Sequence, residues 1–181
     1  MFSTMSIVTQ EALARVTRYA LAVLLLTSVH HAYGAFAYHT LWRLDAVFVS
    51  AFAAAAIISS LVVIQRNTDE TVRDIAFWVF TAVVLVVPVA LIGLFEGAYN
   101  HALKNALYFV GASSTLMNRL FPPPTYELPN DGFFEATGVM QAVLGSITAW
   151  RLYRLVWSRF GRIVVAPKES RWTKAFRRVP E

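Results

Sequence analysis

The stretch IAFWVFTAVVLVVPVALIGLF, residues 75–95, runs for twenty-one residues without a charge. A helix needs about 20 apolar residues to cross the hydrocarbon core of a bilayer, so this stretch predicts a transmembrane helix. Pro88 lies in its middle, and because proline removes a backbone donor we expect a kink there. Gly93 and Gly97 are four residues apart, a spacing that lets a second helix approach closely.

Three further runs, 19–37, 46–64 and 133–153, are also predominantly apolar, and the last of them contains Glu135 near its start and Arg151 near its end. The whole chain is 57% hydrophobic with a mean hydropathy of +0.52, whereas soluble domains are nearer 45–50% apolar. We therefore predict an all-α integral membrane protein, a four-transmembrane-helix bundle. The first run has a competing interpretation as a secretory signal peptide, since it has a basic flank and small residues at Ala35 and Ala37.

The segments outside these spans are polar or mixed. Residues 1–16 are amphipathic and predict a helix on the membrane surface. Residues 105–121 are rich in aromatic side chains and predict an interfacial helix or re-entrant segment between the third and fourth spans. The prolines 122–124 must end that helix, so we expect an ordered loop before the fourth span.

The basic residues predict the orientation. The termini and the loop after the second span carry thirteen of the sixteen Lys and Arg residues, and the other side carries Arg43, Lys104 and Arg119. By the positive-inside rule both termini are cytoplasmic, in a bacterial inner or plasma membrane. We divide the chain into a four-span domain, 1–157, and a basic cytoplasmic tail, 158–181, that contacts anionic lipid. Neither the charge pattern nor any motif predicts a nucleic-acid partner.

Ionisable residues gather at the predicted outer ends of the spans. Ionisable groups near hydrocarbon are costly, so they indicate a functional site or a specific partner. The ionisable residues in question are His30, His31, Glu96, His101 and Glu135, and the amide of Asn100 lies among them. His30 and His31 are adjacent, so on an α-helix they point about 100° apart and cannot both face one point squarely. His101, beyond the third span, is expected to lie shallower than they do.

Imidazole and carboxylate together are typical ligands of zinc, iron, copper or manganese. We predict a transition-metal site formed by His30, His31, Glu96, His101 and Glu135. A haem held by His31 and His101 is a weaker alternative. The chain has no cysteine, which excludes thiolate metal sites and a catalytic thiol.

Three functions fit this pattern. The first is a metal-binding or acid–base membrane enzyme or redox protein, with Glu96, His101 and Asn100 as candidate catalytic residues. The second is a non-catalytic accessory subunit, in which histidine–carboxylate pairs only hold helices together and Glu135 complements a helix dipole. The third, a small transporter, is less favoured because no polar path continues into the inner half of the spans. Membrane partner subunits or a homo-oligomer are further expectations.

Overall fold

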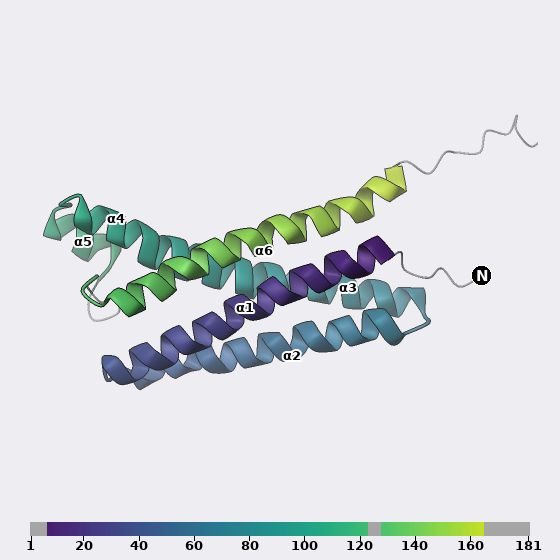
Figure 1. Cartoon of the computed structure of the whole chain (residues 1–181), viewed down its shortest axis with the longest axis horizontal. Coiled ribbons are helices and arrows are strands. Elements are labelled where there is room, and N and C mark those ends of the chain that lie inside the picture. Colours follow the sequence, from purple (N-terminus) through teal and green to yellow (C-terminus); the bar gives the residue numbers. More distant parts are fainter. Residues whose placement is uncertain (1–6, 123–127, 165–181) are drawn as a thin grey trace, which may run out of the picture.

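The computed structural model describes residues 7–122 and 128–164, and these residues form helices without strands. The long helices are α1 (Ile7–Ala37), α2 (Asp45–Arg66), α3 (Glu70–Val84) continued by the π-helix η2 (Leu85–Leu103), and α6 (Gly132–Val164). Shorter elements are the 3₁₀ turn η1 (Leu41–Leu44), α4 (Lys104–Phe109) and α5 (Ser114–Leu120). Figure 1 shows the long helices lying side by side, with α4 and α5 together at one end. The predicted all-α fold is confirmed.

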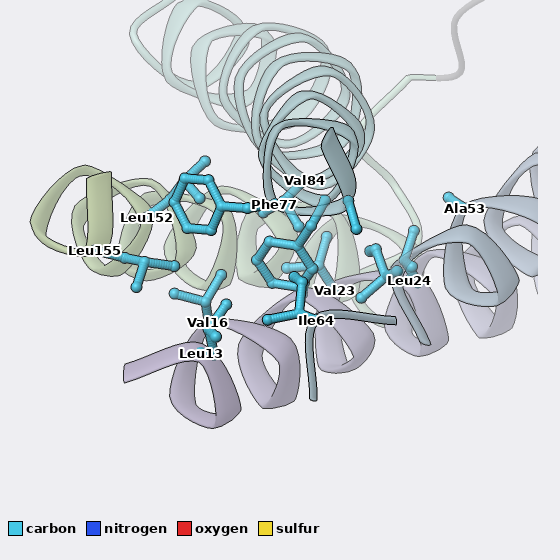
Figure 2. Packing of buried hydrophobic residues seen from close by; sticks show 14 of the residues in the cluster. Leu13, Val16, Val23, Leu24, Ala53, Ile64, Phe77, Val84, Leu152 and Leu155 are labelled. Atoms are coloured by element: carbon cyan, nitrogen blue, oxygen red, sulfur yellow. The ribbon is translucent and has the colours of Figure 1, made fainter. Parts of the chain in front are cut away.

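The long helices enclose one shared interior. α1 packs between α2 and α6, α2 packs on α3, and η2 packs on α6. The apolar core joins Leu13 and Val16 of α1 with Leu155 of α6 and Phe77 of α3, as Figure 2 shows. This packing corrects one expectation. Residues 7–16 do not form a separate surface helix, because the buried side chains of Leu13 and Val16 anchor them to the core as part of α1.

Three helical segments are long and apolar enough to cross a membrane: Gln10–Ala37, Leu41–Arg66 and Glu70–Phe109. They expose large apolar side chains in mid-helix, where Leu25, Phe52 and Leu94 are 68%, 77% and 67% exposed. Surfaces of this kind indicate contact with lipid or another protein. α6 is not among the three segments, because polar residues such as Glu135 and Gln141 interrupt its apolar sequence. The fourth span therefore remains a prediction.

Proline determines where the third long helix changes its winding. A proline ring clashes with the carbonyl four residues earlier, which for Pro88 is that of Val84. α3 ends at Val84, and the chain continues as the wider π-helix η2, with i→i+5 hydrogen bonds. The start of α3 is simpler, because Asp69 caps it by accepting from the N–H groups of Thr71 and Val72 at 2.8 and 3.3 Å.

The loop regions fit the sequence in part. Residues 105–121 contain α4 and α5, so the segment is helical, as predicted, and Phe121 is buried against Tyr99. Residues 123–127 and 165–181, which include part of the proline run and most of the basic tail, lie outside the described residues. The described start of the tail contains Arg159, whose guanidinium pairs with Asp74 and lies 4.2 Å from the Phe77 ring centroid.

Candidate metal centre

The π-helical winding of η2 brings Glu96 and His101 to one face. In an α-helix, residues five apart point about 140° away from each other. In a π-helix the i→i+5 bond places them nearly above one another. Accordingly His101 Nε2 lies 3.6 Å from Glu96 Oε1, and Asn100 Nδ2 donates to Glu96 Oε2 at 2.7 Å. The side chains of Glu96, Asn100 and His101 therefore lie on one surface of η2.

Both histidines of α1 meet the same carboxylate. The Nε2 atoms of His30 and His31 lie 3.7 and 3.6 Å from Glu96 Oε1. Their rings are nearly perpendicular, at 81° with centroids 5.1 Å apart, so each approaches Glu96 from a different side. Two adjacent imidazoles thus converge on one atom despite the 100° between their Cβ directions, because the carboxylate lies between them. Three imidazole nitrogens now surround Glu96 Oε1.

Two of these histidines have a hydrogen-bond partner on the opposite ring nitrogen. His30 Nδ1 lies 2.9 Å from Thr137 Oγ1, and the Thr137 hydroxyl lies 2.8 and 3.0 Å from the Phe133 and Phe134 carbonyls. With its proton donated to a carbonyl, the Thr137 oxygen accepts the hydrogen of His30 Nδ1. In the neutral imidazole Nε2 is then a bare lone pair. The His30 Nε2 atom is buried and has no hydrogen-bond partner in the described part of the chain.

His101 is held in the same tautomer by a carboxylate. Its Nδ1 atom lies 2.7 Å from Glu135 Oε2, which accepts the Nδ1 hydrogen. Glu135 also accepts from Lys104 Nζ at 2.9 Å through its other oxygen. Metal-binding histidines usually donate the hydrogen of their other ring nitrogen to a carboxylate, a carbonyl or water, as His101 does to Glu135. Glu135 thus contacts His101 from behind and does not face Glu96.

The four side chains of the cluster differ in burial. His30 and His101 are 0% and 2% exposed, while the side chains of His31 and Glu96 are 12% and 17% exposed. The Phe134 ring stacks on His30 at a centroid distance of 4.0 Å and forms one wall of the cluster. His31 Nδ1 is buried without a hydrogen-bond partner among the described residues. His31 is therefore the least constrained of the three histidines.

The first turn of α6 positions Glu135 and Thr137. Asp131 caps this helix by accepting from the N–H groups of Phe133 and Phe134, each at 3.0 Å, and the Tyr33 hydroxyl donates to it at 2.7 Å. The N–H of Phe134, and then the Tyr33 hydroxyl, hold the pKa of the Asp131 carboxyl below its usual range. The Asp131–Tyr33 bond ties the start of α6 to α1, on which His30 and His31 lie.

The structure brings His30, His31, Glu96 and His101 together, and three of these, His30, Glu96 and His101, offer donor atoms within 4.8 Å of one another. The ring centroids of His30 and His101 are 4.8 Å apart, so any difference in depth between them is no larger than that distance. Sequence reasoning missed Lys104 and Thr137, which support Glu135 and His30. A signal for Lys104 existed, since it is one of only three basic residues on the predicted outer side and carries a costly charge there.

Arg43 was missed in the same way. Its side chain is 5% exposed, its Nε donates to Thr40 Oγ1 at 2.8 Å, and its guanidinium lies 5.4 Å from the Phe134 ring centroid. It thus lies behind the aromatic wall of the cluster. Two of the three basic residues on the predicted outer side, Arg43 and Lys104, are therefore buried beside the site.

The fold and the cluster together define a class: a helical protein with several candidate membrane spans and a buried histidine–glutamate group able to hold a metal ion. Comparison with known protein families, characterised proteins and solved structures gives no significant match. The chemistry of the cluster is therefore the basis for assigning a function.

Proposed function

We propose that this chain is a metal-dependent membrane protein in which His30, His31, Glu96 and His101 bind one divalent transition-metal ion. One observation carries the proposal. The Nε2 atoms of His30 and His101 face a carboxylate oxygen at 3.7 and 3.6 Å, which is too long for hydrogen bonds, while their Nδ1 atoms bond Thr137 and Glu135, so in the neutral rings each Nε2 is an acceptor. Acceptors that converge in a buried space repel one another, and a cation between them removes that cost.

The spacing of the donors supports this proposal. Zinc binds imidazole nitrogen and carboxylate oxygen at about 2.0–2.1 Å, so donors around a tetrahedral ion lie roughly 3.4 Å apart. The three distances from Glu96 Oε1 to the histidine Nε2 atoms are 3.6–3.7 Å. His30, Glu96 and His101 offer donor atoms within 4.8 Å of one another, and His31 would have to move toward this group to complete four-coordinate geometry. Three imidazoles with one carboxylate suit zinc, iron, copper or manganese.

The packing favours a bare ion over haem. A haem held by His31 and His101 would need a flat space between their rings. Glu96 lies in that space, since its Oε1 atom is 3.6 Å from Nε2 of each histidine. The ring centroids of His30 and His101 are only 4.8 Å apart, which closes the space further.

His31 supports a catalytic use of the ion. Catalytic zinc sites keep three protein ligands and one exchangeable position, whereas structural sites use four. His31 is the most exposed of the three histidines, and its Nδ1 atom lacks a hydrogen bond that would orient it. We infer that His31 can give way to water or substrate. Asn100 adjoins the site and has a free acceptor, because its Oδ1 atom is buried without a partner among the described residues.

We further propose that α6 is a fourth span and that the site lies near the non-cytoplasmic surface. Support comes from the packing of α6 against α1 and η2 and from the positive-inside pattern. A metal ion held by His30, Glu96 and His101 would there supply a Lewis acid able to activate water or polarise a substrate. The rival function, an accessory subunit in which the cluster is structural, predicts the same fold without a bound ion.

The first prediction concerns metal content. Purified protein should contain about one transition-metal ion per chain, and His101→Ala should lose it, because three remaining donors bind a metal more weakly than four. The measurement is elemental analysis after reconstitution with zinc, iron, manganese or copper. The matched control is His39→Asn, since His39 is exposed, lies outside the cluster, and has a φ of 55° that asparagine tolerates. Metal-free protein under all four conditions would favour the accessory-subunit function.

The second prediction tests the supporting carboxylate. Glu135→Gln keeps the size of the side chain but removes the charge that orients His101 and pairs with Lys104. Loss of the hydrogen-bond partner of a metal-binding histidine lowers metal affinity by about 10–100-fold. Competition with a chromophoric chelator measures that affinity. An affinity equal to that of wild type would mean that His101 does not bind the ion through Nε2.

A further inference from the structure

Two adjoining cavities lie between α1 and α6 at the end of the bundle away from the histidines. They measure about 190 and 380 Å³, and both are lined by Arg15 and Arg151. Arg18 and Tyr19 complete the larger cavity, and Arg154 and Glu11 contribute to the smaller one. The cavities thus form one basic pocket, defined by Arg15, Arg18, Arg151 and Arg154.

The arginines of this basic pocket are not neutralised by their neighbours in the pocket. Glu11 is its one carboxylate, and it pairs with Arg15. Arg18 Nε reaches the Ala14 carbonyl at 3.4 Å, a long bond that uses one of its five N–H groups. Arg151 Nε is buried and has no hydrogen-bond partner in the described part of the chain. A buried guanidinium nitrogen without an acceptor indicates a missing anionic partner.

An aromatic row lies along the same part of α6 as the basic pocket. Trp150, Tyr153 and Trp157 are 58%, 54% and 65% exposed and stack along α6, with centroid distances of 5.8 and 6.0 Å. Tryptophan and tyrosine are enriched at the level of lipid headgroups. The row alternates along α6 with Arg151 and Arg154, a pattern typical of a helix end at headgroup depth.

We propose that the basic pocket binds the phosphate of an anionic phospholipid headgroup. Arginine forks match phosphate oxygens in a bidentate way, and basic pockets between membrane helices bind multiply charged headgroups. The two cavities share Arg15 and Arg151, an arrangement that suits a lipid with two phosphates. The acyl chains would then lie beside Trp150 and Tyr153. This site is independent of the metal centre, because it lies at the opposite end of α1 and α6.

The test uses the full-length protein in nanodiscs of neutral phosphatidylcholine. Native mass spectrometry would count bound lipid as cardiolipin or phosphatidylglycerol is added, and a parallel titration would use inorganic phosphate. We expect cardiolipin to bind more tightly than phosphatidylglycerol, and Arg151→Ala and Arg18→Ala each to weaken binding at least about fivefold. Arg18 is exposed, so its variant should fold even if Arg151→Ala does not. Arg66→Ala removes an exposed arginine outside the pocket and is the matched control.

Two results would overturn the proposal. Equal weakening by Arg18→Ala and Arg66→Ala would show a diffuse charge effect with no defined site. Saturable binding of inorganic phosphate at the same arginines, without any preference for anionic lipid, would assign the pocket to a soluble phosphate compound. Preference for phosphatidylglycerol over cardiolipin, with loss in both pocket variants, would support the lipid site and contradict the two-phosphate assignment.

Discussion

Glu96→Gln is expected to lower metal affinity by more than about 100-fold, the largest effect of any single change in the site. Changing a residue that only supports a ligand already lowers affinity by up to about 100-fold, and Glu96 is itself a proposed ligand. Glu96 Oε1 lies within 3.7 Å of all three histidine Nε2 atoms. Glutamine preserves the side-chain volume and can still accept from Asn100. The change therefore removes the negative charge with little disturbance of packing.

Thermal unfolding distinguishes a metal ligand from a structural carboxylate. A ligand present at 100 times its Kd stabilises the folded state by about 2.7 kcal/mol, equivalent to roughly 5–10 °C in a chain of this size. We expect added metal to raise the Tm of wild-type protein by that amount and to leave the Tm of Glu96→Gln unchanged. Glu70→Gln is the control, since Glu70 is an exposed carboxylate at the start of α3.

The structural alternative gives the opposite pattern. If Glu96 only held histidines in place, Glu96→Gln would lower the Tm equally with and without metal, and wild-type protein would not respond to metal. That result would contradict the metal site and leave the fold unaffected. The two arms of the same measurement thus separate the metal-centre and accessory-subunit functions.

Sequence reasoning located the polar end of the bundle because membrane physics constrains composition strongly. An uncharged run such as 75–95 can hardly be anything but a buried or lipid-facing helix, and ionisable residues at its end need partners. The presence of His30, His31, Glu96 and His101 in one cluster followed from this topology.

The relative positions of the side chains inside the cluster could not be predicted from the sequence. Periodicity arguments assume 3.6 residues per turn, and on that basis His101 flanks the face of Glu96 and Asn100 without sharing it. The π-helical winding after Val84 changes this relation, and no hydrophobic pattern reports it. The Thr137–His30 and Lys104–Glu135 contacts span 107 and 31 residues of sequence, so only the packing of α6 against α1 and η2 brings them together.

That packing gives the second large prediction, a loss of stability in Gly97→Ala. Gly97 lies where η2 crosses α6, and a Cβ atom there would be 2.9 Å from both Ala142 Cα and the Gln141 carbonyl carbon. These neighbours are backbone atoms, which cannot rotate away, so the helices must separate. Overpacking of this kind costs about 1–3 kcal/mol and can cost more. We expect the Tm to fall by about 2–12 °C.

Gly132→Ala is the matched control, because a Cβ atom at Gly132 would meet nothing within 4 Å. The same variant pair also links the fold to the site. Gly97 directly follows Glu96, and separation of η2 from α6 would move His101 away from Glu135 and from the facing α1 histidines. We therefore expect Gly97→Ala to lower metal affinity even at temperatures where it remains folded. Equal Tm values for the two glycine variants would mean that η2 and α6 do not pack in close contact.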